Sequence, residues 1–225
     1  MKYKDDVKEV DAFIEENIRS VKVEYNFSIR YYLKIIFNKS DNVKDNVKMV
    51  IIMMNPSNAT DEESDQTVSE VLEFAKPKYK EVIIFNVLPF YGTNSDNLAP
   101  LFKEGSEKEN LEQLLKNNIK IINKKLSKEK DTEIFLATGC PKDGEVKKVF
   151  LRQLQKIYGL LKNNSGVRAF SITEDKKRFL NNEGTTYHPR YLKIKNAFTH
   201  KKIVEVVVKD EDGTFSLTKK GNTPK

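Results

Sequence analysis

The sequence predicts an α/β protein, a three-layer αβα sandwich in which helices cover both faces of a mostly parallel central sheet. Three observations indicate this fold. Short apolar runs such as VIIMM and VIIF lack polar alternation, which is typical of strands buried on both faces. Amphipathic helical patterns separate these runs, and a polar loop follows each of them. The length of 225 residues suits a single domain over residues 1–225.

The N-terminal part of the chain is expected to form a helix followed by a strand. Residues 5–19 mix acids with apolar residues at helical spacing, namely Val7, Val10, Phe13, Ile14 and Ile18. This pattern predicts an amphipathic N-terminal helix within residues 1–20. The next stretch, VKVEYNFSIRYYLKIIFN, is rich in β-branched and aromatic residues, so it predicts the first strand of an α/β core over residues 21–200.

Strands and helices alternate through the rest of the core. We expect strands at VKMVIIMM, EVIIFNVLPF, TEIFLATG and VRAFSIT, and helices at SDQTVSEVLEFAK, EKENLEQLLKNNIKIINKKL and GEVKKVFLRQLQKIYGLL. Pro77 ends the first of these helices, because proline cannot continue one. The tail KIVEVVVKDEDGTFSLTKKG contains the turn signal Asp-Gly and predicts a C-terminal hairpin extension over residues 201–225.

Composition narrows the class of protein. Lys and Arg number 40 against 33 Asp and Glu, a formal charge of +7, which favours nucleic acid as a partner over an acidic protein or a membrane surface. The single cysteine, Cys140, excludes an intrachain disulfide and a cysteine-based zinc site. No apolar run reaches the roughly 18 residues of a membrane span, and the acidic N-terminus lacks the apolar core of a signal peptide. We therefore expect a cytoplasmic protein that holds no metal or other cofactor.

The polar loops after the strands are the places to look for a site, because open α/β sheets bind ligands at the carboxyl ends of their strands. Asn55-Pro56-Ser57 follows one buried strand, and the residue before a proline is held in extended geometry. Asn86 ends the next strand. A carboxamide has both donors and an acceptor, so either asparagine can recognise the edge of a base. The alternative for both is an ordinary turn asparagine.

His188 is the most suggestive of the remaining polar residues. It lies in TTYHPRYL, between small polar residues and the pair Arg190 and Tyr191, whereas His200 lies in FTHKKI and is interpreted as a surface residue. The alternative for His188 is a hydrogen-bonded structural histidine.

The acidic cluster after Asn55 offers one further candidate. Asp65 could serve as a general base, or contact a ribose or a metal, but it is also an acid at a helix N-terminus, where the helix dipole favours it. Ser57 and Thr67 could bind a phosphate or a base. Cys140 follows a buried strand and is interpreted as a small turn residue.

The ordered motifs MMNPS, VIIFNVLPF, IFLATG and YHPRYL resemble the uracil-DNA glycosylase superfamily. More closely, RYYL, MMNPSNATDEESDQTV, NVLPFYGTNSDNL and HPRYL resemble a bacterial and phage family known only as domain of unknown function 1643. The resemblance covers roughly residues 28–196, and it implies a fold like that of the glycosylases.

The resemblance also implies roles for individual residues. Asn55 would position a water, Asn86 would read the pyrimidine edge, and His188 would donate a hydrogen bond to O2 of the leaving base. Arg190 and Tyr191 would lie near the loop that enters the minor groove. The chain departs from the glycosylase pattern, because methionines stand where glycine precedes the Asn-Pro motif and no carboxylate stands at the water-activating position.

Three functions remain open at this point. The first is a DNA- or nucleobase-processing hydrolase that acts on an ordinary or a modified pyrimidine or on its N-glycosidic bond. The second is a base-modifying transferase of the same fold. The third is a nucleic-acid or nucleotide-binding protein without turnover. The missing carboxylate and the missing glycine favour the second and third functions over that of a standard uracil glycosylase.

Overall fold

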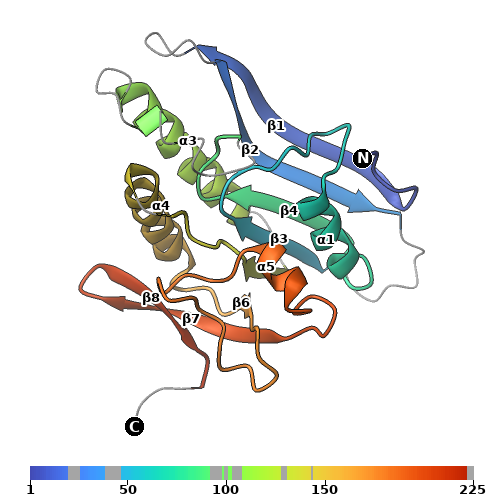
Figure 1. The fold of residues 1–225 in the computed structure, drawn as a ribbon, viewed down its shortest axis with the longest axis vertical. Helices are drawn as coiled ribbons and strands as arrows, with labels where there is room; N and C mark the ends of the chain where they lie inside the picture. The colour runs from blue at the N-terminus through green and yellow to red at the C-terminus, as the bar shows by residue number, and fades with distance from the viewer. Residues whose placement is uncertain are drawn as a thin grey trace.

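A computed structural model describes residues 1–19, 26–38, 47–91, 98, 101–102, 108–127, 131–142 and 144–221. These residues form one eight-stranded sheet with helices on both of its faces (Figure 1). The fold is thus α/β, as the sequence predicts. No described helix has the length and apolar character needed to cross a membrane.

The strands and helices alternate along most of the chain. The strands are β1 (Val7–Arg19), β2 (Asn26–Phe37), β3 (Lys48–Met53), β4 (Glu81–Asn86), β5 (Thr132–Leu136), β6 (Val167–Phe170), β7 (Ile203–Glu211) and β8 (Thr214–Lys219). The helices are α1 (Gln66–Ala75), α3 (Lys108–Leu126), α4 (Glu145–Leu161) and α5 (Pro189–Ile194). The strand order in the sheet is β1-β2-β4-β3-β5-β6-β7-β8.

The sheet is mixed, and the expectation of a mostly parallel sheet is wrong. Among the described strands, the pairs β3–β4, β3–β5 and β5–β6 are parallel. The pairs β1–β2, β2–β4, β6–β7 and β7–β8 are antiparallel. The helix-connected strands form the parallel centre, and two antiparallel strands extend it on each side. Antiparallel neighbours need no crossover helix, so the strand–helix alternation on which the prediction rested does not reveal them.

The predicted N-terminal helix within residues 1–20 is also wrong, because Val7–Arg19 is strand β1. It pairs with β2 from Val7 opposite Phe37 to Arg19 opposite Asn26. The register shifts at three places along this pair. Each shift breaks the two-residue alternation of side chains, so the apolar residues recur at irregular intervals that imitate helical spacing. Phe13 packs on the ring of Tyr31 at a centroid distance of 5.0 Å.

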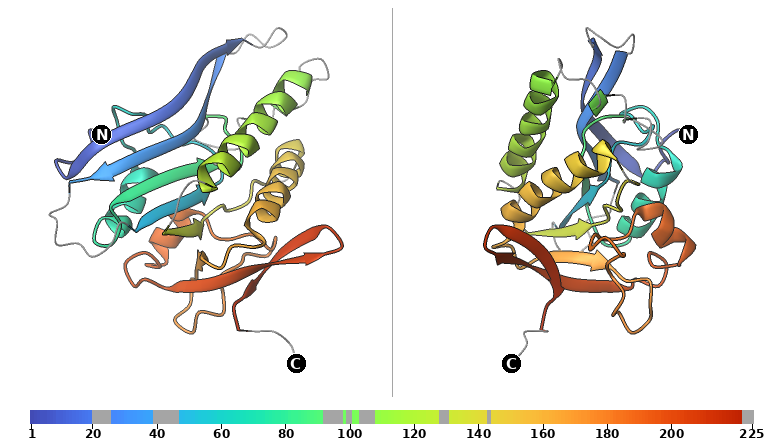
Figure 2. Two further views of the ribbon diagram at one scale, coloured as in Figure 1. Left: turned by 180° about the vertical axis from the view of Figure 1, so that it is seen from behind. Right: turned by 60° about the vertical axis from the view of Figure 1, so that its left-hand side comes forward.

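Two apolar layers lie on the opposite faces of the sheet. In β3, Val50 and Ile52 face one layer with α3 and α4, whereas Met49, Ile51 and Met53 face the other with α1 and α5. All five of these residues are buried, as expected for a central strand. Figure 2 shows the two helix pairs on opposite sides of the sheet. The three-layer arrangement therefore follows from the apolar character of β3 on both of its faces.

The C-terminal strands form a hairpin that packs on α4. Asp212 and Gly213 occupy its turn with φ angles of 53° and 82°, the left-handed region that tight hairpin turns require. Gln155 of α4 donates to the carbonyl of Phe215 at 2.9 Å and accepts from its N–H at 2.7 Å. These two hydrogen bonds fix the hairpin against the helix layer.

The topological switch point of the sheet, where the direction of the chain connections reverses, lies between β3 and β5. β3 continues through α1 to β4 on one side, and the chain then returns across to β5 on the other side. The loops after β3 and β5 therefore diverge from adjacent parallel strands, which is the position where open α/β sheets bind ligands.

A partly buried cluster of charged residues lies at the opposite, amino end of the parallel strands. The Glu133 carboxylate at the start of β5 accepts hydrogen bonds from Lys78, at 2.7 and 2.8 Å, and from Tyr79 and Arg168. Partial burial alone would raise the pKa of Glu133, but the hydrogen bonds from Lys78 and Tyr79 and the charge of Arg168 hold it below its ordinary value.

Replacing Glu133 by Gln should lower the free energy of unfolding at pH 7 by about 1–2 kcal/mol, because charged hydrogen bonds are lost in a partly exposed site. The pKa of Glu133 is depressed in the folded state, so its stabilisation is present above the ordinary pKa of Glu and disappears as the pH falls through the folded value. Urea unfolding of both proteins from pH 7 to pH 3 should show the gap closing. The exposed Glu205→Gln is the control, with an expected change within about 0.5 kcal/mol.

Candidate functional site

The loops after β3 and β4 are joined by backbone hydrogen bonds. Val87 N–H donates to the carbonyl of Met53 and Leu88 N–H to that of Met54, both at 2.9 Å. Met53 is also the register partner of Asn86. The partly buried Asn55 follows immediately, and its Nδ2 donates to the carbonyl of Pro56 at 3.2 Å. The two asparagines predicted from the sequence thus lie on adjoining segments at one edge of the sheet.

Asn86 is fully buried, and its amide orientation is set by Arg30. Nη2 of Arg30 lies 3.4 Å from Oδ1 of Asn86. A guanidinium has donors only, so the asparagine must present its oxygen to it. Nδ2 of Asn86 then faces elsewhere, and it has no hydrogen-bond partner among the described residues. The backbone carbonyl of Asn86 accepts from Asn118 of α3 at 2.9 Å, which ties the strand end to that helix.

Arg30 is a part of this region that sequence reasoning missed. Its side chain is fully buried, and Nη1 donates to the carbonyl of Ala59 at 2.5 Å. Its guanidinium carbon lies 5.6 Å from the centre of the Tyr91 ring. Burial lowers the pKa of Arg30, and the nearby Tyr91 and Asp65 oppose that effect. A single arginine inside the apolar strand NFSIRYYLKIIF is the signal that could have found it.

Asp65 caps helix α1. One carboxylate oxygen accepts from Val68 N–H at 2.9 Å, and the other accepts from Ala59 N–H at 3.2 Å. Ala59 therefore lies between Asp65 and Arg30: its N–H donates to Asp65, and its carbonyl accepts from Arg30. Thr67 lies half-buried in the first turn of the same helix, and the buried Oγ of Ser57 has no partner among the described residues.

The segment that carries His188 is bound to the loop after β5. Thr186 accepts from Gly139 N–H through its carbonyl at 2.9 Å and from Thr138 N–H through Oγ1 at 3.0 Å. Thr185 Oγ1 donates to the carbonyl of Gly139 at 2.8 Å. The small polar residues before the His-Pro pair thus fasten it to the carboxyl end of β5.

Gly139 lets His188 approach this strand end closely. A Cβ at position 139 would lie 2.9 Å from Cβ of His188 and 3.1 Å from Cε of Met54, and the φ angle of Gly139 is 63°. His188 and Met54 therefore meet over the same glycine. Because Met54 directly precedes Asn55, the structure brings His188 to the switch point between β3 and β5, beside the Asn55 loop.

The imidazole of His188 is neutral at physiological pH and has a defined tautomer. Its Nδ1 accepts from Arg190 N–H at 3.3 Å as the N-cap of α5. Burial lowers the pKa of His188 to about 4, and the charge of Arg190 contributes. A neutral ring whose Nδ1 accepts must carry its proton on Nε2, so Nε2–H is a donor.

Arg190 and Tyr191 follow on the exposed part of α5. The ring of Tyr191 stacks on that of Tyr187 at a centroid distance of 5.3 Å, and the residue is 40% exposed. Arg190 and Tyr191 thus follow His188 closely in the chain, but their side chains are open to solvent.

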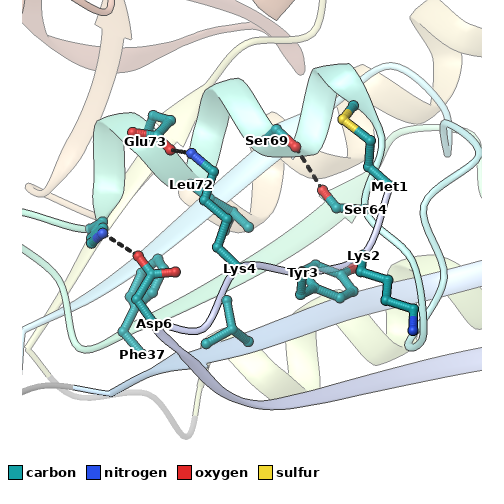
Figure 3. A pocket seen from close by; sticks show the side chains of 12 residues that line it. Met1, Lys2, Tyr3, Lys4, Asp6, Phe37, Ser64, Ser69, Leu72 and Glu73 are labelled. Carbon is teal, nitrogen blue, oxygen red and sulfur yellow. Dashed lines mark hydrogen bonds and ion pairs between the residues drawn. The ribbon is translucent and has the colours of Figure 1, made fainter.

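A small hollow lies between the N-terminal segment and α1 (Figure 3). Met1, Tyr3, Lys4, Ser64 and Leu72 are among the residues around it. Its volume of about 60 Å³ is far below the roughly 300–1,000 Å³ of a typical ligand pocket, so we regard it as a packing gap. Within the described ranges, no group of three or more His, Cys, Asp and Glu residues could hold a metal ion.

Gly139→Ala should lower the free energy of unfolding by about 1–3 kcal/mol more than Gly184→Ala does. The reason is that only the new methyl group at position 139 is forced against neighbouring atoms. Gly184 has a similar φ angle of 71° but open space around its Cβ position, so Gly184→Ala measures the backbone strain alone. Denaturant unfolding of the two variants provides the comparison. Equal losses would contradict the close approach of His188.

The imidazole of His188 should stay uncharged down to about pH 4, with its proton on Nε2. In the unfolded state the imidazole binds a proton near pH 6.5, whereas in the folded state it binds one only near pH 4. The free energy of unfolding therefore falls as the pH drops from 6.5 to 4. Nitrogen-detected NMR titration checks both the pKa and the tautomer. In His188→Asn, which keeps a capping oxygen, this part of the pH dependence should vanish.

A family comparison covers most of the region just described. The model of the family described as "Protein of unknown function (DUF1643)" matches residues 30–190, a segment that begins with the buried Arg30 and ends two residues after His188. Comparisons with curated proteins and with solved structures gave no match. The predicted resemblance to this family is confirmed, and the chain belongs to the DUF1643 family.

Proposed function

We propose that the carboxyl ends of β3, β4 and β5 bind a nucleobase, and that the chain acts on a pyrimidine or its N-glycosidic bond, as uracil-DNA glycosylases do. The observation that carries this proposal is the neutral His188. Its ring is fixed through Nδ1 at the switch point of the sheet, which leaves Nε2–H available as a donor.

The proposed chemistry uses that donor. Cleavage of the bond between C1′ of the sugar and the base leaves an oxocarbenium-like sugar and an anionic base. Water then adds to C1′, and the proton that it releases passes to the base anion. A hydrogen bond from Nε2–H to a carbonyl oxygen of the leaving base stabilises the developing negative charge, an effect worth about 3–4 kcal/mol in comparable sites. Because the pKa of His188 is about 4, this donor remains neutral across the physiological range and does not change with small shifts in pH.

Asn86 and Asn55 would complete the recognition. Nδ2 of Asn86, beside Arg30, donates to no other described residue, and it is suited to a carbonyl oxygen of a base. Asn86 has no exposed surface here, so a base could reach Nδ2 only after the residues that cover it move aside. Asn55 could hold a water through its carboxamide, but it cannot remove a proton from it. Pro56 keeps that side chain on an extended segment.

The remaining candidates take supporting roles in the proposal. Both oxygens of Asp65 already accept backbone N–H groups, so we assign this carboxylate to holding the loop rather than to proton transfer. Ser57 and Thr67 lie on that loop and on α1, within reach of a sugar or phosphate that follows the base. Arg190 and Tyr191, exposed on α5, would contact the polymer once the base has left its stack.

Nucleotide or nucleic-acid binding without turnover is the second candidate. The observation that favours it is the absence of a carboxylate at the position of Asn55, together with the engaged state of Asp65. A base-modifying transferase would use the same residues. Assays that detect binding and conversion separately distinguish these functions.

Mass spectrometry of oligonucleotides that carry uracil, mismatched thymine or a modified pyrimidine tests the proposal. The wild type should release or alter one of these bases, and His188→Asn should reduce the rate by roughly 10²–10³-fold. His200→Asn is the matched control, since this exposed histidine lies outside the site, and it should retain the wild-type rate. A wild-type protein that binds such a base without converting it supports the second candidate, and one that neither binds nor converts refutes both.

A further inference from the structure

A second surface, distinct from the candidate site, lies between helices α3 and α4. It is a groove of about 560 Å³ lined by Lys116, Ile119 and Lys120 of α3 and Lys156 of α4, with Glu112 and Gln113 at one end. The two helices stand side by side on one face of the sheet (Figure 2). Lys116, Lys120 and Lys156 are exposed, and Ile119 is half-buried between them.

The charge of the three groove lysines is not balanced by neighbouring acids. Some described lysines are matched by acids, as in the pairs Lys76–Asp6, Lys147–Glu183, Lys162–Asp210 and Lys193–Glu70, whereas others, the groove lysines among them, are not. In the described part of the chain, Lys116, Lys120 and Lys156 form no ion pair. Glu112 does not neutralise them, because its carboxylate is already paired with Arg152. The groove therefore holds uncompensated positive charge.

Helix stability does not account for this arrangement. Lys116, Lys120 and Lys124 recur every four residues, about 6 Å apart along α3. Like charges at this spacing destabilise a helix by about 0.2–0.5 kcal/mol per pair. The helix dipole favours lysine only in the last turn, which covers Lys124 and Lys125 but not Lys116 or Lys120. A linear row of cations that the helix itself does not favour suggests an external anionic partner.

We infer that this groove, named here the α3–α4 groove, docks the phosphate backbone of duplex nucleic acid. A duplex offers a regular line of phosphates that matches a row of lysines. A membrane surface fits less well, because the described groove has no exposed aromatic or large apolar anchor for insertion. Single strands fit less well too, since none of the described residues that line the groove has an aromatic side chain on which bases could stack.

The groove connects to the candidate site through α3. Asn118 lies between Lys116 and Lys120 and donates to the backbone carbonyl of Asn86. The lysines lie on one face of α3, and the end of β4 lies against the opposite face. About one helix diameter, roughly 10 Å, therefore separates them. This inference rests on the lysines alone and does not require the base chemistry proposed above.

Fluorescence anisotropy with a labelled duplex of unmodified DNA tests the inference. The triple variant Lys116→Glu, Lys120→Glu and Lys156→Glu should bind at least roughly tenfold more weakly at 0.1 M salt than the wild type. Its slope of log binding constant against log salt should be shallower by about 2.7, which corresponds to three lost phosphate contacts at 0.9 each. The matched control is Lys80→Glu, Lys176→Glu and Lys201→Glu, which changes the net charge equally at exposed positions elsewhere.

The outcomes distinguish binding through the groove from binding through net charge, and they do not depend on the proposed base chemistry. Losses that are equal in the two triple variants would overturn the inference, because net charge alone would then explain binding. A wild type that ignores duplex DNA but binds vesicles with anionic headgroups through the same lysines would overturn it as well. Loss of duplex binding only in the groove variant would support it, even if no base is released in any assay.

Discussion

The buried guanidinium of Arg30 is the interaction on which the arrangement of the candidate site depends. It extends from β2 to the carbonyl of Ala59 in the loop after β3 and to Oδ1 of Asn86 at the end of β4. Three segments distant in sequence are thereby fixed to one side chain. Removing such a charge from water costs several kcal/mol, and the oxygen acceptors and the Tyr91 ring offset that cost only in this geometry. The amide orientation of Asn86 and the position of the Ala59 loop follow from it.

The sequence predicts the centre of this fold better than its borders. Strand β3 and its neighbours are recognisable because burial on both faces leaves a purely apolar run, and α4 because its apolar side chains keep the helical period over 17 residues. Strand β1 misled the prediction, since its register shifts erase the alternation that identifies a strand. The Asp-Gly turn signals the antiparallel β7–β8 hairpin, but the antiparallel pairs β1–β2, β2–β4 and β6–β7 could not be predicted, because their pairing is decided by tertiary contacts that leave no periodic signal.

The candidate site shows the same division. Asn55, Asn86 and His188 could be selected because each is a polar residue at the point where a buried strand or a polar segment ends. Sequence could not tell that Gly139 brings His188 against Met54, nor that the Asp65 carboxylate is engaged on both oxygens, because these contacts join separate segments. Nor could it assign the protonation state of His188, which depends on burial and on the charge of Arg190, or its tautomer, which depends on the backbone N–H of Arg190. Chemistry-bearing residue types are visible in sequence, whereas their electrostatic surroundings are a product of the fold.

The irregular pairing of β1 has a consequence for how the molecule behaves in concentrated solution. β1 is the last strand on its side of the sheet, and a regular outer strand is a template onto which another chain can add. Three register shifts bend its backbone out of the flat geometry that such addition requires, and Glu9 and Asp11 place exposed negative charge along it. The feature that disguised β1 in the sequence therefore also discourages sheet-to-sheet growth into fibrils.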